Sequence, residues 1–444
     1  MVDPVRQTST FDKDGDDGKH GRRSSTTLPE QKGGSFSRKF GAGLISGAAD
    51  DDPSGIATYS QVGAQFGFSL GWTVLFCYPL MVGVQGLSAR IGAVTGQGLA
   101  RNLRRHYPAS LARVATLMLL VANVINIGAD LAAMGAALHL LAGGPQLVYA
   151  VLFGIVCVLL EIFVRYRRYA MFLKWLTLSL FAYVAVVFIV DVPWMEAARG
   201  VFIPSFTFGG EQATAFVAVL GTTISPYLLF WQAGQEVEEL GRRHHQRLGA
   251  NPQAAKPELV RIEIDTIVGM ALSGVVALSI MIATAATLHA NGTTHIETSA
   301  QAAEALQPIA GNVAFALFAA GIIGTGMLAV PVLAGSAAYA VAELFQWPEG
   351  LDRAPRRAKA FYGTIAVATL GSAVVFLVGV DPFLLLYWSA ITNGMLAGPL
   401  IAMMTMMAAN RHIMGQLKAP WWMLTLGGAT ALVMLAATAG MFLL

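Results

Sequence analysis

Residues 50–55 read Asp-Asp-Asp-Pro-Ser-Gly and lie about a dozen residues inside an apolar segment that runs from Phe40 past Ala64. A regular helix that faces lipid cannot hold three consecutive acids at this depth, because each ionised carboxylate there costs roughly 2.5–3.5 kcal/mol. Pro53 lacks the backbone N–H of a helix interior, and Gly55 makes unusual backbone angles accessible. Such a break is tolerated at bilayer depth only where protein buries it or water reaches it. The stretch therefore predicts a helix interrupted in mid-membrane, at an ion or substrate site.

The composition of the whole chain is that of a membrane protein. Of its 444 residues, 55% are hydrophobic and 12% are charged, whereas soluble domains are about 25% charged. Apolar runs of about 20 residues recur along the sequence, and each is long enough to cross a bilayer as a helix. We therefore expect an all-α integral membrane protein with about eleven spans, near residues 40–65, 70–91, 112–141, 146–166, 170–192, 212–238, 262–289, 309–345, 358–379, 382–410 and 420–444.

The basic residues support this number of spans and predict an orientation. If the N-terminus is cytosolic, 28 of the 29 Lys and Arg residues fall in the N-terminal tail or in cytosolic loops, and only Arg199 falls outside. This positive-inside bias predicts a cytosolic N-terminus and an outward C-terminus. The basic residues then serve membrane topology, and we expect no nucleic-acid partner. The loop residues concerned are Arg90, Arg101, Arg104, Arg105, Arg113, Arg165, Arg167, Arg168, Lys174, Arg242, Arg243, Arg247, Lys256, Arg261, Arg353, Arg356, Arg357, Lys359, Arg411 and Lys418.

A second interruption lies in the sixth predicted span, where residues 221–227 read Gly-Thr-Thr-Ile-Ser-Pro-Tyr. It again places a proline at mid-depth among hydroxyl residues. The first and sixth spans correspond if spans 1–5 and 6–10 are two repeats, and an odd number of helices per repeat inverts one repeat relative to the other. Paired broken helices at matching positions are typical of secondary transporters with a site at the membrane midplane. A plain proline kink at Pro226 is the simpler alternative.

These features predict the organisation of the chain. Residues 1–39 are polar, charged and rich in Gly and Ser, which predicts a disordered cytosolic tail without a cleavable signal. Residues 40–410 would form the transporter core, with repeat one at 40–192 and repeat two at 212–410. Residues 411–444 would add a loop and one further membrane helix. The short tail and the missing organellar signal favour a bacterial inner membrane.

The direction of the half-helices favours a cation. One half of span 1 ends near Asp52 and one half of span 6 ends near Ile224, so both present C-terminal carbonyls and partial negative charge at the breaks. Asp52 adds a full negative charge, and Ser54, Thr222 and Ser225 can add neutral oxygens. No basic residue lies near either break. An amino-acid carboxylate could still bind at the opposite half-helix N-termini, so an amino-acid or organic-solute carrier remains an alternative.

At these two breaks the chain resembles the NRAMP family of divalent metal transporters, which share the LeuT-type fold with two inverted five-helix repeats. The family's Asp-Pro-Gly-Asn in the first broken helix corresponds to Asp-Pro-Ser-Gly at residues 52–55. Its Gly-Ala-Thr-Val-Met-Pro-His in the sixth corresponds to residues 221–227, and its Asp-Leu-Ala in the third helix to residues 130–132. The resemblance covers roughly residues 38–444. It implies a metal ion as substrate, no cofactor, and a site that includes Asp52, Ser54, Gly55, Thr222, Thr223 and Ser225.

The departures from the family pattern bear on the ion. The family's metal-binding asparagine corresponds to Gly55, its soft methionine to Ser225, and two histidines to Tyr227 and Gln232. Carboxylate, hydroxyl, carbonyl and water oxygens suit Mg²⁺, Ca²⁺ and Mn²⁺, and Mg²⁺ keeps several of its waters. In this respect the chain is similar to the NRAMP-related magnesium transporters. We therefore expect Mg²⁺ first and Mn²⁺ second.

Proton coupling is the next expectation from the family pattern. Two acidic positions of the third helix correspond here to Asn123 and Ala133, while Asp130 is retained. Asp130 is a possible proton relay, or alternatively a buried structural acid. The loss of two acids predicts weaker proton coupling than in the parent family.

Other polar residues are weaker candidates. Four of them recur at helical spacing below the sixth break and would line a cytosolic vestibule, or alternatively form a solvated helix end: Gln232, Gln235, Glu236 and Glu239. Thr392 and Asn393 lie where span 10 of the family supplies a polar ligand. Cys77 and Cys157 fall in apolar segments, so we expect two buried thiols. No phosphate-binding loop of the ATPase type is present, so we expect neither an enzyme nor an ATP-driven pump.

The sequence thus predicts a secondary transporter that moves a divalent metal ion by alternating access, with the ion and the lipid bilayer as its partners. The oligomeric state is not predicted. Three alternatives remain: a proton-coupled Mn²⁺/Fe²⁺ symporter of the standard NRAMP type, an amino-acid or organic-solute carrier, and a metal sensor that does not transport.

Overall fold

A computed structural model describes residues 42–164, 180–205, 209–242, 247–253, 255–307 and 311–443, and all regular elements in these ranges are helices. Within them, nine helical segments are long and apolar enough to cross a membrane. The predicted tail at 1–39, the first half of the fifth predicted span and the basic residues Arg165, Arg167, Arg168, Lys174 and Arg243 lie outside the described residues.

The first predicted span is two short helices, and this is why it is not among the nine segments. Helix α1 covers Ala42–Asp50 and helix α2 covers Pro53–Phe66. Asp52 is the N-cap of α2, with its side chain accepting a hydrogen bond from the Gly55 backbone N–H. Pro53 occupies the first helical position, where the missing N–H costs nothing. The predicted break is therefore confirmed at residues 51 and 52.

The sixth predicted span is broken in the same way. Helix α10 covers Gly210–Thr223 and helix α11 covers Pro226–Arg242. Ile224 leaves the helical conformation with φ −122° and ψ 61°. Pro226 then opens α11, so Pro226 begins a new helix and is not a kink within one.

The remaining elements follow the predicted spans closely. The helices are α3 (Gly71–Thr95), α4 (Leu99–His106), α5 (Ala109–Ala142), α6 (Gln146–Phe163), α8 (Phe181–Ile189), α9 (Trp194–Phe202), α12 (Lys256–Thr287), α13 (Ser299–Glu304), α15 (Ala314–Phe345), α16 (Lys359–Gly371), α17 (Pro382–Ala409), α18 (Arg411–Met414) and α19 (Trp421–Leu443). Short 3₁₀ turns are η2 (Leu248–Ala250), η3 (His289–Asn291), η4 (Gly311–Val313), η5 (Pro355–Arg357), η6 (Ser372–Val378) and η7 (Gly415–Leu417).

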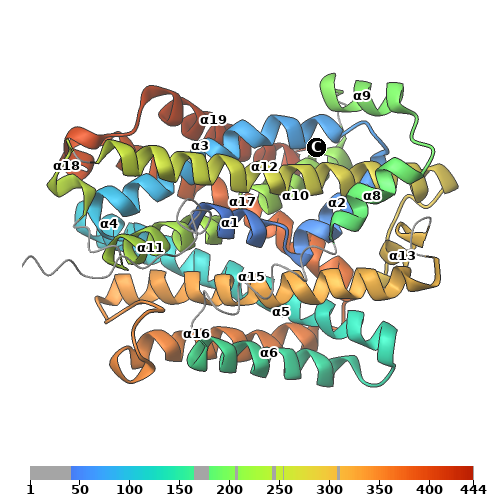
Figure 1. Cartoon of the computed structure of the whole chain (residues 1–444), viewed down its shortest axis with the longest axis horizontal. Helices are drawn as coiled ribbons and strands as arrows, with labels where there is room; N and C mark the ends of the chain where they lie inside the picture. Colours follow the sequence, from blue (N-terminus) through green and yellow to red (C-terminus); the bar gives the residue numbers. More distant parts are fainter. Residues whose placement is uncertain are drawn as a thin grey trace, which may run out of the picture. The chain divides into compact units, whose positions relative to one another are not determined.

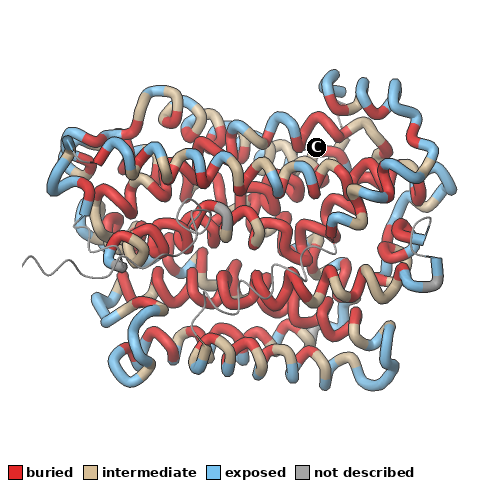
Figure 2. The backbone as a smooth tube through the Cα atoms, in the orientation of Figure 1, coloured by how far each residue is buried: buried red, intermediate tan, exposed pale blue. Residues whose placement is uncertain are grey.

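The broken helices lie inside a layer of longer ones. In Figure 1, α1 and α2 run between the long helices α12 and α15, and α12 packs along both of them. Helix α17 packs against α10, α2, α5 and α19. Figure 2 shows the burial concentrated on the inner helices. Of the most apolar 18 residues in each helix, 83% are buried in the broken segment Gly210–Gly241, 28% in α6 and 22% in α19. Helices α6 and α19 therefore form part of the lipid-facing surface.

Glycines allow the closest helix contacts around the breaks. A Cβ on Gly47 of α1 would collide with the Gly269 backbone of α12, and a Cβ on Gly221 of α10 would collide with the Ala390 carbonyl of α17. These contacts bring α12 and α17 directly against the two broken helices. Both cysteines, Cys77 and Cys157, are free and buried, as predicted.

Candidate ion site

Asp52 lies at the first break and is held there by three hydrogen-bond donors. The Gly55 backbone N–H donates to Oδ1 at 2.8 Å, and the Ser54 hydroxyl donates to the same oxygen at 2.6 Å. The Tyr227 hydroxyl donates to Oδ2 at 3.0 Å. Asp52 is 1% exposed. The carboxylate is therefore held in one orientation before the ion binds. Such preorganisation lowers the entropy lost on binding.

The end of α10 meets the start of α2. The Thr222 and Ser54 hydroxyl oxygens lie 3.5 Å apart. A Cβ placed on Gly55 would lie 3.3 Å from the Thr222 Oγ1. One turn further along α2, the Tyr59 hydroxyl lies 3.0 Å from the Thr223 Oγ1. The residues predicted at the two breaks are therefore brought together, although Thr223 is engaged with Tyr59 and also donates to the Val219 carbonyl.

The Ser225 hydroxyl turns back onto the end of its own helix. It donates toward the Gly221 and Thr222 carbonyls, each at 2.9 Å. These carbonyls lack helical partners because α10 stops at Thr223, and the serine satisfies part of that demand. Ser225 thus contributes an oxygen at the break but makes no described contact with Asp52.

Tyr227 is a site residue that the sequence analysis noted only as a departure from a family histidine. Its hydroxyl joins Asp52 to the Ala49 carbonyl, at 3.1 Å, in the last turn of α1. It therefore connects the sixth span to both sides of the first break. The signal available in the sequence was its position directly after Pro226, which places it in the first turn of α11.

The other two acids of the triplet face α12. The Ser273 hydroxyl donates to Asp50 Oδ2 at 2.6 Å and lies 3.1 Å from Asp51 Oδ1. Among the described contacts, none of the three carboxylates pairs with a lysine or arginine. The break therefore concentrates three buried carboxyl groups without a basic partner, and a bound cation would offset the charge of those that are ionised.

Residues from α5 and α17 complete the surroundings. Asp130 on α5 is 0% exposed, and neither of its carboxylate oxygens has a partner in the described part of the chain. Asn393 on α17 is buried with its Nδ2 unpartnered, next to the crossing of Gly394 and Gly221. The Thr392 hydroxyl instead donates to the Trp388 carbonyl. Unpaired buried polar groups of this kind commonly face water or an ion.

The polar face of α11 is packed between helices in this structure. Gln232 donates to the Thr266 hydroxyl at 3.0 Å, and Gln235 donates to the Tyr339 hydroxyl at 3.1 Å. Glu236 and Glu239 lie 3.6 and 3.9 Å from Arg261. Helices α12 and α15 therefore cover the four residues predicted to line a vestibule.

A different face of α11 borders a hollow of about 480 Å³. Gly234, Glu238 and Gly241 line it, together with residues of the α3–α4 linker, α4, α15 and the loop after α15. Arg101 and Glu349 form an ion pair of 2.7 Å within it. Burial raises the pKa of Glu349 to about 7, although the neighbouring Arg101 acts in the opposite direction. This hollow lies at the predicted cytosolic end of the broken sixth span.

The donor set at the breaks is one carboxylate with neutral oxygens. Throughout the described ranges, no three His, Cys, Asp or Glu side chains converge in a way that could hold a metal ion. Asp52, the hydroxyls of Ser54, Thr222 and Ser225, and the free carbonyls at the end of α10 would have to be supplemented by water. Such a set suits a hard cation that stays partly hydrated.

Two broken membrane helices that face each other at a buried, oxygen-rich break define a transporter of the LeuT-type fold, with two inverted five-helix repeats. The similarity to known proteins gives the family. The family model described as natural resistance-associated macrophage protein-like (Nramp) matches residues 43–444. The chain therefore belongs to the NRAMP family.

Individual relatives agree with this assignment. The divalent metal cation transporter MntH of Klebsiella pneumoniae is 28% identical over 407 residues, covering 89% of this chain and 92% of the relative. The protein of the same name from Yersinia pestis is 28% identical and covers 85% and 88%. The proteins named here are transporters and not enzymes.

Solved structures support the fold. The manganese transporter of Eremococcus coleocola matches with a TM-score of 0.71 and 17% identity, covering 94% of this chain and 88% of the other. Mhp1, a nucleobase-cation-symport-1 family transporter, matches with a TM-score of 0.55 and 14% identity, covering 91% and 92%. The second match extends the likeness to LeuT-fold carriers of quite different solutes.

Proposed function

We propose that this chain carries divalent metal cations across the membrane by alternating access, with Mg²⁺ as the preferred ion. The observation that carries the proposal is Asp52, a buried carboxylate at the first break. Its described partners are hydrogen-bond donors, namely two hydroxyls and one backbone N–H. Relatives named as divalent metal cation transporters support the metal over an amino acid as substrate.

The preference for Mg²⁺ rests on the donor set. Ser225 and Tyr227 supply hydroxyls at the two positions where the family pattern has methionine and histidine, and Gly55 removes an amide oxygen. Hard oxygen donors favour Mg²⁺ and Mn²⁺ over softer ions. Mn²⁺ is the second candidate, because a solved relative is named as a manganese transporter.

The test is the removal of the Asp52 carboxylate. We expect Asp52→Ala to abolish Mg²⁺ and Mn²⁺ uptake into proteoliposomes, since Asp52 is the carboxylate that the described contacts join to Ser54 and Tyr227 at the break. Asp52→Asn should fail equally, although asparagine retains the N-cap of α2, whose loss costs about 1 kcal/mol. The asparagine variant thus separates loss of ion binding from loss of folding.

Asp50→Ala and Asp51→Ala are the matched controls, because the described contacts of both side chains are with Ser273 of α12 and not with the groups that hold Asp52. Both should retain more uptake than Asp52→Ala. Wild-type uptake by Asp52→Asn would disprove the site. Ion binding by calorimetry without any flux would instead indicate a metal sensor.

A further inference from the structure

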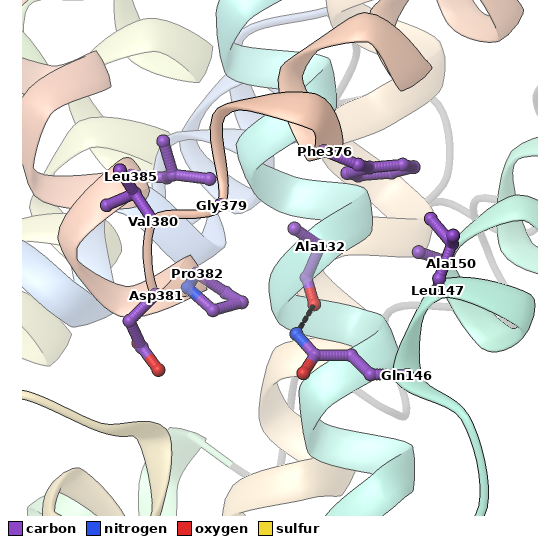
Figure 3. A pocket seen from close by; sticks show the side chains of 10 residues that line it. All are labelled: Ala132, Gln146, Leu147, Ala150, Phe376, Gly379, Val380, Asp381, Pro382 and Leu385. Atoms are coloured by element: carbon purple, nitrogen blue, oxygen red, sulfur yellow. Dashed lines mark hydrogen bonds between the residues drawn. The ribbon is translucent and has the colours of Figure 1, made fainter.

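A second hollow, of about 490 Å³, lies apart from the two breaks. It is formed where α5, the start of α6, the end of η6 and the start of α17 meet (Figure 3). Helix α6 begins at Gln146 and α17 at Pro382, and α5 ends at Ala142. These ends lie on the predicted outer side of the membrane.

The walls of this hollow are divided by polarity. Phe376 and Val380 lie above Asp381 and Gln146 in the view of Figure 3, and Leu147 lies at the side of the hollow. No lysine, arginine or histidine is among the lining residues of the described chain. The hollow therefore combines apolar walls with one carboxylate and one amide at the same end.

The Asp381 carboxylate is only partly engaged. Its Oδ1 accepts a hydrogen bond from the Phe383 backbone N–H at 2.8 Å, which caps α17. Its Oδ2 has no partner among the described residues. Burial raises the pKa of Asp381, and a positive group placed beside the carboxyl would lower that pKa and favour the ionised form. Gln146 donates to the Ala132 carbonyl at 3.4 Å, which leaves its own carbonyl oxygen as an acceptor.

The chemistry of the walls selects the kind of cation. An inorganic divalent ion needs about six to eight oxygen ligands, and the side chains that line the hollow offer only one carboxylate and one amide. An organic ammonium needs one anion, one or two acceptors and apolar surface for its body. Ligand sites of about 300–1,000 Å³ have this composition, and an aromatic ring adds attraction for a cation.

We propose that this hollow binds a primary ammonium group carried on an apolar body, with the ammonium between Asp381 and Gln146 and the body against Phe376. The polar end lies at the predicted outer ends of the helices, so the ammonium faces the headgroup level and the apolar body points inward. An amphiphilic amine dissolved in the outer solution and a lipid with an amine headgroup share this chemistry.

The test uses the full chain in nanodiscs of phosphatidylcholine, titrated calorimetrically with 4-phenylbutylamine. We expect one saturable site. Asp381→Asn should weaken binding of the amine by roughly tenfold or more, because it removes a charge-assisted hydrogen bond. The asparagine should still cap α17. Phe376→Leu should weaken binding less, since it keeps the apolar volume. The alcohol 4-phenylbutanol should bind at least about tenfold more weakly than the amine.

Asp191→Asn is the matched control, because Asp191 is an exposed acid in the linker between α8 and α9 and does not line the hollow. It should bind the amine like wild type. Absence of saturable binding, equal binding by Asp381→Asn, or equal affinity for the alcohol would each overturn the proposal.

Nanodiscs of phosphatidylethanolamine distinguish the two sources of the amine. If this lipid occupies the site, the apparent affinity for 4-phenylbutylamine falls in wild type and not in Asp381→Asn. If the affinity is unchanged, the site takes amines from solution. The assay measures binding directly, so its result is independent of which metal ion the chain transports.

Discussion

At the scale of single residues, three adjacent acids have different environments. Asp52 points to Ser54, Gly55 and Tyr227, while its two neighbours point to Ser273 on α12. The sequence could single out Asp52 because Pro53 follows it and must open a helix. It could not predict the contact with Tyr227, since that contact depends on how two segments 175 positions apart are packed.

Restoring the two family ligands should change the ion preference. Ser225→Met with Gly55→Asn adds one thioether and one amide oxygen, so we expect the double variant to gain Cd²⁺ or Mn²⁺ binding and to lose Mg²⁺ transport. Each added ligand would shift selectivity by roughly 5–150-fold, the range of a typical coupling energy. The measurement is competition between Mg²⁺ and Cd²⁺ for uptake into liposomes.

The structure adds a condition to this prediction. A side chain at residue 55 starts only 3.3 Å from the Thr222 hydroxyl, so that hydroxyl must shift by a few tenths of an ångström to admit the asparagine. Ser279→Met is the matched control, because Ser279 donates to a carbonyl four residues earlier, as Ser225 does, but lies in α12. A wild-type protein that already prefers Cd²⁺ strongly would refute the hard-ion proposal.

At the scale of helices, the positions of the breaks were predictable and their packing was not. Proline and glycine within an apolar run are enough to interrupt a helix, and α1, α2, α10 and α11 begin and end within a few residues of the predicted points. The four polar residues of α11 illustrate the limit. Helical spacing placed them on one face, but it could not show that α12 and α15 cover that face.

The crossing of α10 and α17 gives a prediction at this scale. Gly221→Ala should lower the thermal stability of the purified protein and its ion uptake, because the new methyl group would lie 2.8 Å from the Gly394 Cα and closer to the Ala390 carbonyl. Overpacking of this kind costs about 1–3 kcal/mol. Gly274→Ala in α12 is the control, since nothing lies within 4 Å of that site. There, alanine should stabilise by roughly 0.5–1 kcal/mol. Equal unfolding temperatures for the two variants would contradict the close crossing.

At the scale of the whole molecule, hydropathy and charge predicted the fold class and the order of the spans, because a bilayer imposes helix length and sidedness directly on the sequence. The repeat boundaries and the orientation of the termini remain predictions. The hollow beside Asp381 could not be predicted, since its walls come from four elements that approach one another only in the assembled bundle.

Transport as a whole should proceed without proton coupling. Asn123 donates to the Leu333 carbonyl at 2.9 Å, so this position holds α5 against α15 and carries no proton. Ala133 cannot carry one either. Metal influx into proteoliposomes that contain a trapped pH-sensitive dye should therefore produce no measurable acidification of the lumen, while Mg²⁺ uptake proceeds.

Asp130 is the residue on which this prediction depends. It is buried without a described partner, as is Glu161 on α6, and either acid could in principle exchange a proton. Metal-dependent acidification that disappears in Asp130→Asn but persists in Glu161→Gln would make Asp130 the relay and restore proton symport. Acidification lost only in Glu161→Gln would place the proton route on α6. Because both substitutions preserve side-chain volume, an unchanged unfolding temperature in each variant would confirm that a lost proton signal reports lost chemistry and not a collapsed bundle.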